Sequence, residues 1–137
     1  MHQGDMQLCV NVAKMLAKRS RAMRAQVGCV IWHTEKRTII SLGYNGTPAG
    51  EDNTMELNNK TLDTVIHAEI NAIKKLSWWT RRKHLVLFVT HSPCVNCANA
   101  IVTAGIRKVY YLDNYGTPAG LNLLRDKGVE VKRLFTL

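Results

Sequence analysis

The stretch HLVLFVTHSPCVNCANAIVTAGIRKVYYL, residues 84–112, contains two kinds of apolar pattern and decides the fold. Residues 84–90 form a continuous apolar and β-branched run, which predicts a buried strand. Residues 94–104 carry apolar side chains at helical spacing, and Gly105 ends the predicted helix. The run at 108–112 predicts a second strand. A strand, a crossover helix and another strand favour parallel neighbours in a sheet that helices cover on both faces.

The sequence on either side of this stretch extends the same architecture. Upstream, one amphipathic pattern predicts a helix, and two short β-branched runs joined by a polar turn predict a hairpin. Downstream, an apolar pattern that stops at Gly128 predicts a short helix before a last strand. The additional expected elements are a helix over 5–19, strands over 27–32 and 37–44, a helix after His67, a helix over 119–127 and a strand over 129–134.

Length and composition predict one domain over residues 1–137. Of the 137 residues 46% are hydrophobic, which suffices for one core and leaves no room for a second. The first residues, MHQGDMQLCV, lack the long apolar stretch of a signal peptide. No later segment approaches the roughly 18 apolar residues that span a membrane. We therefore expect a soluble, cytoplasmic protein with no membrane partner.

The net charge indicates the kind of partner, and the cysteine pattern indicates the kind of cysteine chemistry. A formal net charge of +9 indicates an anionic partner, which includes nucleic acid, nucleotides and membrane surfaces. Four cysteines at uneven spacing (Cys9, Cys29, Cys94 and Cys97) are too few for a disulfide framework. In a cytosolic protein the CxxC pair at Cys94 and Cys97 more often binds a metal or does redox chemistry.

His67 and Glu69 lie two residues apart in TVIHAEINAIKKL, an apolar run that reads as the start of a helix. Together with Cys94 and Cys97, His67 would give a metal three protein ligands and leave the fourth tetrahedral position open. That arrangement is typical of a catalytic zinc rather than a structural one. Glu69 can then reach a metal-bound water without being a ligand, which is the position of a proton shuttle.

The order H-x-E followed by P-C-x-x-C is the pattern of zinc-dependent nucleobase deaminases. Alone, an HxE pair is more often a surface pair at a helix start, and a lone CxxC can be redox-active or half of a zinc finger. A structural zinc module would need a fourth protein ligand. Cys9 and Cys29 are available for that in principle, although their patterns favour ordinary core positions.

Four segments resemble the cytidine and deoxycytidylate deaminase superfamily, and two of them resemble its deoxycytidylate (dCMP) deaminase branch. The resemblance implies a three-layer α/β/α sandwich of cytidine deaminase-like fold around a mixed five-stranded sheet. It also implies a homohexamer with zinc held by His67, Cys94 and Cys97. The four segments are VIHAEINAI (65–73), VTHSPCVNCANAIVTAGIRKVYY (89–111), RAQVGCVI (24–31) and GYNGTPAG (43–50).

The resemblance further implies hydrolysis of dCMP to dUMP and ammonia, a step that feeds thymidylate synthesis. Glu69 would take a proton from the zinc-activated water and deliver protons to N3 and to the leaving ammonia. The implied substrate contacts are Asn45 with the deoxyribose hydroxyl, Arg24 with the 5′-phosphate, Tyr115 with the pocket wall, and the backbone around Ala68 and Ser92 with the base edge.

Regulation and metal count are further expectations. In this family GYNGTPAG helps to form a site where dCTP activates and dTTP inhibits, usually with Mg²⁺, and glycine-rich turns suit anion binding. The residues 47–66 contain no Cys or His, so we expect one zinc per subunit. The expected effector residues are Gly43, Tyr44, Gly46 and Gly50.

Two alternatives stay open at this point. One is a deaminase that acts on cytosine or adenine in RNA or single-stranded DNA, with Trp78 and Trp79 beside the basic run 81–83 as a stacking surface. The other is a zinc-stabilised nucleic-acid-binding module, against which the open fourth coordination position argues. Residues 45–64 show little periodicity and predict a long loop of functional or disordered character.

Overall fold

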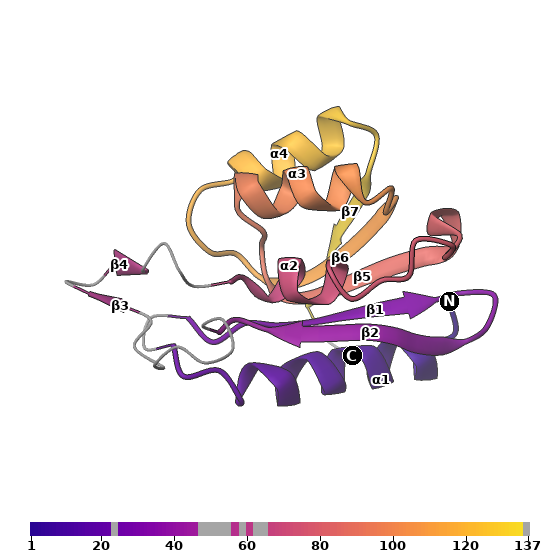
Figure 1. Ribbon diagram of the computed structural model, residues 1–137, viewed down its shortest axis with the longest axis horizontal. Coiled ribbons are helices and arrows are strands. Elements are labelled where there is room, and N and C mark those ends of the chain that lie inside the picture. The colour runs from indigo at the N-terminus through magenta and orange to yellow at the C-terminus, as the bar shows by residue number, and fades with distance from the viewer. Residues whose placement is uncertain (23–24, 47–55, 58–59, 62–65, 136–137) are drawn as a thin grey trace.

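A computed structural model of the protein describes residues 1–22, 25–46, 56–57, 60–61 and 66–135. A five-stranded sheet with the order β2-β1-β5-β6-β7 forms its centre (Figure 1). The strands are β1 (Gly28–His33), β2 (Thr38–Tyr44), β5 (Leu85–His91), β6 (Lys108–Asp113) and β7 (Glu130–Arg133), and the helices are α1 (Gln3–Ala17), α2 (Ala68–Ile73), α3 (Val95–Thr103), α4 (Ala119–Asp126) and the 3₁₀ turn η1 (Arg82–His84).

The sheet is mixed, as the sequence predicts. β1 pairs antiparallel with both β2 and β5, whereas β5, β6 and β7 are parallel. The parallel part follows from the two crossover helices, because α3 connects β5 to β6 and α4 connects β6 to β7. The antiparallel part follows from the β1–β2 hairpin. These features confirm the predicted α/β class and the five-stranded mixed sheet.

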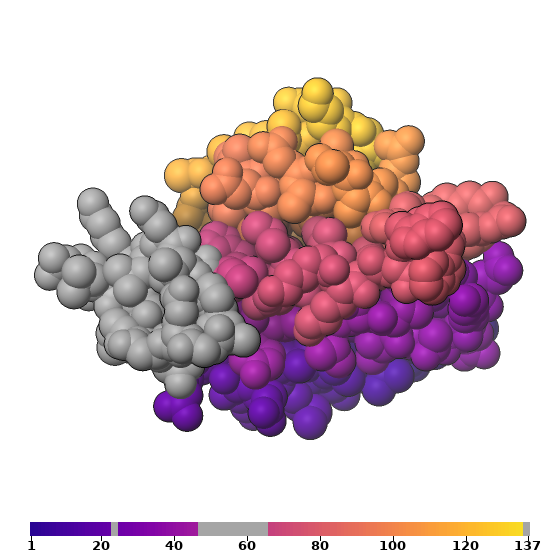
Figure 2. Space-filling view, in the orientation of Figure 1, coloured from indigo at the N-terminus to yellow at the C-terminus, as the bar shows by residue number. Residues whose placement is uncertain are grey.

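Helices cover both faces of the sheet (Figure 1). α1 packs on one face against β1, β2 and β5, while α2, α3 and α4 lie on the other. Successive side chains of β5 point to opposite faces of the sheet. Leu87 and Val89 pack in the core beneath α2 and α3, whereas Val86 and Phe88 pack in the core beneath α1. The space-filling view shows α3 and α4, in orange and yellow, on the side opposite the indigo α1 (Figure 2). The predicted three-layer sandwich is therefore confirmed.

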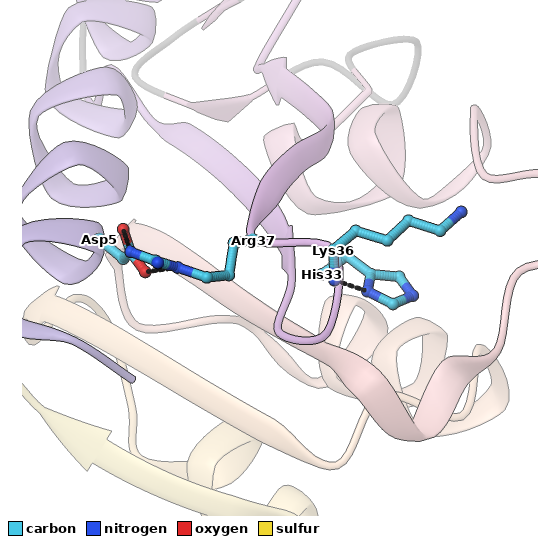
Figure 3. A network of polar contacts seen from close by, with 4 residues as sticks. All are labelled: Asp5, His33, Lys36 and Arg37. Carbon is cyan, nitrogen blue, oxygen red and sulfur yellow. Dashed lines mark hydrogen bonds and ion pairs between the residues drawn. The ribbon is translucent and has the colours of Figure 1, made fainter.

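The β1–β2 turn lies at the end of the sheet where β5 begins, since His33 pairs with Leu85. Arg37 adopts a positive φ of 52° in this turn and points at α1. Its guanidinium donates to both carboxylate oxygens of Asp5, at 3.1 and 3.2 Å (Figure 3). The Lys36 N–H donates to Nδ1 of the buried His33 at 3.1 Å. The Arg37–Asp5 contact holds the hairpin turn to the first helix, and the His33–Lys36 bond closes the turn itself.

Helix ends largely match the sequence expectations. Gly105 and Gly128 follow α3 and α4 with φ of +80° and +81°, a conformation that favours glycine. The segment 45–64, expected to be a loop, differs in one respect, because two short strands, β3 (Glu56–Leu57) and β4 (Lys60–Thr61), pair antiparallel within it. Within the described ranges, no helix combines the length and apolar character needed to cross a bilayer.

Candidate active site

Two turns bring the predicted metal ligands together at the end of β5. His67 is the N-cap of α2 and Cys94 is the N-cap of α3, both in extended backbone conformation. Cys97 lies in the first turn of α3, with its side chain buried against the core. α2 and α3 pack side by side on the same face of the sheet, so segments about 30 residues apart meet at their N-terminal ends.

The three candidate ligand atoms lie within 4.8 Å of one another. His67 Nδ1 is 3.2 Å from Cys97 Sγ and 3.5 Å from Cys94 Sγ. Among the described residues, no other group of three His, Cys, Asp or Glu side chains is close enough to hold a metal. Cys9 and Cys29 are buried in the two hydrophobic cores instead. The arrangement is thus a three-ligand set without a fourth cysteine, as a catalytic zinc site requires.

The protonation of the two thiols fits a divalent cation. A hydrogen bond from Cys97 lowers the pKa of Cys94 to about 4, with further help from His67. The same contact with Cys94, together with burial, raises the pKa of Cys97 above its ordinary value. Without a cation the pair therefore loses one proton readily and keeps the second. Zn²⁺ binds thiolates and imidazole nitrogen, so these three donors suit it.

Glu69 lies in the first turn of α2, beside this ligand set. It is only 4% exposed, which is unusual for a carboxyl group. Burial is the main reason that its pKa rises to about 7, and the nearby Cys94 adds to the effect. Glu69 is outside the group of candidate ligands, as the sequence pattern predicts. A buried carboxyl that exchanges a proton near neutral pH is suited to general acid–base chemistry.

A cavity of about 360 Å³ opens beside Glu69. Its size lies in the range of small-molecule sites. Besides His67, Glu69 and Cys94, it is lined by four residues that the sequence resemblance assigned to substrate: Asn45, Ala68, Ser92 and Tyr115. Arg24, the fifth, lies outside the described residues. The structure therefore brings four of the five together at one cavity.

Two of these side chains also hold the walls of the cavity. Asn45 accepts from the Val27 N–H at 3.0 Å through Oδ1 and donates to the Ala25 carbonyl at 2.9 Å through Nδ2. The Ser92 hydroxyl accepts from the Tyr115 N–H at 2.8 Å and donates to the Tyr115 carbonyl at 3.1 Å. Each polar side chain thus fixes a loop that closes one side of the cavity.

The sequence analysis missed several residues of the lining, notably Ala22, Ala25, Val27, His91, Val95 and Thr117. A signal existed for His91, which precedes SPC in the motif-bearing turn. For the apolar residues no chemical signal existed, because small side chains in a connecting segment predict nothing until the chain is folded.

Three of the expected effector residues, Gly43, Tyr44 and Gly46, lie at or just after the end of β2, next to the cavity residue Asn45. A Cβ on Gly43 would lie 2.7 Å from the Ala68 carbonyl, so this glycine permits close packing of α2 on β2. The Tyr44 carbonyl accepts from Asn71 Nδ2 at 2.8 Å. The Gly46 N–H donates to the Ile66 carbonyl at 3.0 Å. Gly50 lies outside the described residues.

Comparison with known proteins agrees with this site. The family model for the cytidine and deoxycytidylate deaminase zinc-binding region matches residues 3–113. Among solved structures, the dCMP deaminase of the cyanophage S-TIM5, in complex with dCMP and dUMP, is 34% identical with a TM-score of 0.89, and the match covers 98% of this chain and 99% of that one.

Curated relatives give the same family. ComE operon protein 2 of Bacillus subtilis is 35% identical over 88% of this chain. A probable deoxycytidylate deaminase of Caenorhabditis elegans is 38% identical over 77% of it. The matches span 66% and 55% of the lengths of these two relatives. With the family model matching most of the chain and the ligand set in place, the chain belongs to the cytidine and deoxycytidylate deaminase family.

Proposed function

We propose that the protein hydrolyses dCMP to dUMP and ammonia. The observation that carries this proposal is the buried Glu69 beside a three-ligand site of His67, Cys94 and Cys97, at the inner end of a cavity. The likeness to the cyanophage dCMP deaminase, which spans nearly the whole of both chains, supports the substrate. The longer curated relatives named as deoxycytidylate deaminases support the same reaction.

His67, Cys94 and Cys97 would hold zinc, which when bound supplies the Lewis acidity that makes water nucleophilic near neutral pH. Glu69 accepts a proton from the attacking water and passes it to N3 of the cytosine ring. The water oxygen bonds to C4. Glu69 then takes the second proton from the oxygen on C4 and transfers it to the amino group, so that the C4–N bond breaks as the C4=O bond forms, and ammonia leaves with dUMP as the product. The burial of Glu69 keeps bulk water from competing for these protons.

The cavity walls would place the nucleotide for this transfer. The Ser92 N–H already donates to the Asp113 carbonyl at 2.8 Å, so the Ser92 carbonyl is the group that we propose reads the amino group of the base. The backbone at Ala68 hydrogen-bonds the opposite edge of the base. Asn45 donates its remaining side-chain N–H to the deoxyribose hydroxyl. Tyr115 closes the pocket, and Arg24 meets the 5′-phosphate.

Further parts of the proposal rest on the resemblance of GYNGTPAG to the dCMP deaminase branch. We propose a homohexamer in which residues 1–137 of each subunit form one deaminase domain with one zinc ion. dCTP activates it and dTTP inhibits it, with Mg²⁺, through a site near Gly43, Tyr44, Gly46 and Gly50. The dUMP that it forms feeds thymidylate synthesis in the cytoplasm.

Ammonia release from a panel of substrates tests the proposed reaction. The panel contains dCMP, deoxycytidine, CMP, cytosine and a single-stranded cytosine-containing oligonucleotide, each offered to the zinc-loaded protein. We expect dCMP to give the highest kcat/KM, since deoxycytidine and cytosine leave the phosphate position empty and CMP adds a 2′-hydroxyl. Equal turnover of deoxycytidine, or preference for the oligonucleotide, would contradict the proposed substrate. The dCMP rate curve with dCTP or dTTP then tests the regulation.

A further inference from the structure

His91, the last residue of β5, lines the cavity and has no part in the mechanism above. Strand alternation puts it on the same face as Leu87 and Val89, which is the face that α2 and α3 cover. His91 is half-buried, and its ring contacts that of Tyr115, which is 42% exposed, whereas Glu69 is 4% exposed. His91 therefore lies nearer the opening of the cavity than Glu69 does.

The hydrogen bonds around His91 determine which ring nitrogen carries the proton. Thr90 is 5% exposed, and its Oγ1 accepts from the Gly28 N–H at 3.1 Å. The same Oγ1 is 2.9 Å from His91 Nδ1. Within the described part of the chain, the Thr90 hydroxyl has no other acceptor for its own proton, so it donates to Nδ1. Burial lowers the pKa of His91, which keeps the ring neutral with its proton on Nε2.

Several other polar side chains of the cavity already use a donor within the fold or belong to the proposed catalytic set. The Ser92 hydroxyl uses its only proton on the Tyr115 carbonyl, and Asn45 has one N–H committed to Ala25. His67 and Cys94 belong to the metal ligand set, and Glu69 moves protons. The described lining contains no lysine or arginine. The Nε2–H of His91 is therefore a hydrogen-bond donor in the cavity that makes no hydrogen bond within the described residues and is not part of the metal ligand set.

The position of His91 indicates which part of a ligand it meets. A nucleotide with C4 beside the buried Glu69 directs its sugar–phosphate end toward the opening of the cavity, where the ring pair of His91 and Tyr115 lies. We propose that His91 is a specificity-determining residue whose Nε2–H donates a hydrogen bond to the 5′-phosphate. This inference rests on the proposed deamination of a pyrimidine nucleotide.

The edge-on contact between His91 and Tyr115 supports the geometry. Their ring centroids lie 5.7 Å apart with an interplanar angle of 87°. Ser92 holds the Tyr115 backbone at both its N–H and its carbonyl, and the tyrosine ring packs edge-on against the imidazole. The hydrogen bond from Thr90 orients one ring nitrogen and so gives the other a defined direction.

Kinetics with and without the phosphate test this role. We compare dCMP with deoxycytidine for the zinc-loaded wild type, His91→Leu, which lacks a donor, and His91→Gln, which retains an N–H of similar reach. Loss of one hydrogen bond to a charged acceptor predicts that His91→Leu lowers kcat/KM for dCMP roughly 10- to 100-fold. Because deoxycytidine has no phosphate, its kcat/KM should change less than about threefold in both variants, and His91→Gln should retain most of the dCMP rate.

Equal losses for dCMP and deoxycytidine in His91→Leu would overturn the proposal, and so would an unchanged dCMP rate. Zinc content and melting temperature show whether the variant folds, and His91→Met supplies a second donor-free side chain if leucine is not tolerated. A wild type that releases no ammonia from dCMP would instead refute the proposed function. In that case calorimetric binding of dUMP and deoxyuridine to the wild type and His91→Leu still decides the phosphate contact.

Discussion

The two ends of β5 carry similar residue types in different environments. Where the strand begins, His84 Nε2 is 3.0 Å from a carboxylate oxygen of Glu35, and the Glu35 side chain is 70% exposed. Where it ends, the cavity is lined by His67 and by Glu69, which is 4% exposed. Only the second pair has two thiols within reach of the imidazole. Both ends of β5 thus carry a histidine and a carboxylate. The end at His91 differs because its carboxylate is buried and two cysteines lie beside His67.

The difference in exposure between Glu35 and Glu69 determines whether each carboxylate can exchange a proton near neutral pH. Water screens the exposed Glu35–His84 pair, and such pairs contribute about 0–1 kcal/mol to stability. Glu69 has lost most of its water, so burial raises its pKa to about 7 and its proton becomes available at neutral pH. The chemistry at the end of β5 therefore depends on the helix turns that bury Glu69 beside the metal ligands.

The largest expected effect comes from removing the acid–base group at the buried end. Glu69→Gln should lower kcat for dCMP at least about 10³-fold, since general acid–base catalysis contributes typically 10²–10⁴ and the amide cannot carry the proton. The variant should still bind about one zinc per chain, because Glu69 is outside the ligand set. Ammonia release and metal analysis measure both quantities.

Two matched variants sharpen this prediction. Glu35→Gln makes the same chemical change at the exposed end and should leave kcat within about twofold, as a screened surface pair predicts. Cys97→Ser removes a proposed ligand and should lose zinc and activity together. If Glu69→Gln lost zinc as Cys97→Ser does, Glu69 would be a ligand and the shuttle assignment would be wrong.

Asn45→Ala tests the cavity wall and should have an intermediate effect. The change removes the hydrogen bonds to Val27 and Ala25, which should cost about 1–3 kcal/mol of unfolding free energy. It also removes the proposed sugar contact, so KM for dCMP should rise roughly tenfold. Asn71→Ala is the matched control, because Asn71 Nδ2 donates to the Tyr44 carbonyl outside the cavity lining. A similar rise in KM for both variants would show that Asn45 acts only through stability.

The parts of the molecule that the sequence predicted are those with local signals. The β5–α3–β6 unit follows from apolar spacing and Gly105, and the candidate metal ligands follow from HAE and PCVNC, whose short spacing limits the geometry within each turn. The role of Asn45 in holding Val27 depends on contacts between distant segments, which no local pattern specifies. His91 carried a local signal in its place before SPC, but its orientation depends on Thr90, whose Oγ1 accepts from Gly28 on the neighbouring strand.

The position of Trp78 and Trp79 likewise depends on the fold. They lie between α2 and η1, at 85% and 69% exposure, and their rings form an edge-to-face pair at 5.5 Å. Figure 1 shows this turn at the end of the sheet where β5 begins. The cavity lies at the other end of β5, about 20 Å away at ~3.3 Å per residue. This separation argues against the stacking surface that a nucleic-acid deaminase would need beside its cavity.

The smallest expected effect therefore comes from changing both exposed tryptophans. Trp78→Ala with Trp79→Ala should leave kcat/KM for dCMP within about twofold, because exposed side chains far from a site contribute little to it. Trp32→Ala is the matched control, since Trp32 is 3% exposed and its loss should cost about 3–5 kcal/mol of stability. Ammonia release and thermal unfolding measure the two outcomes. A more than tenfold loss of dCMP turnover in the double variant would mean that the two ends of β5 are coupled, and selective loss of activity on a cytosine oligonucleotide would restore the nucleic-acid alternative.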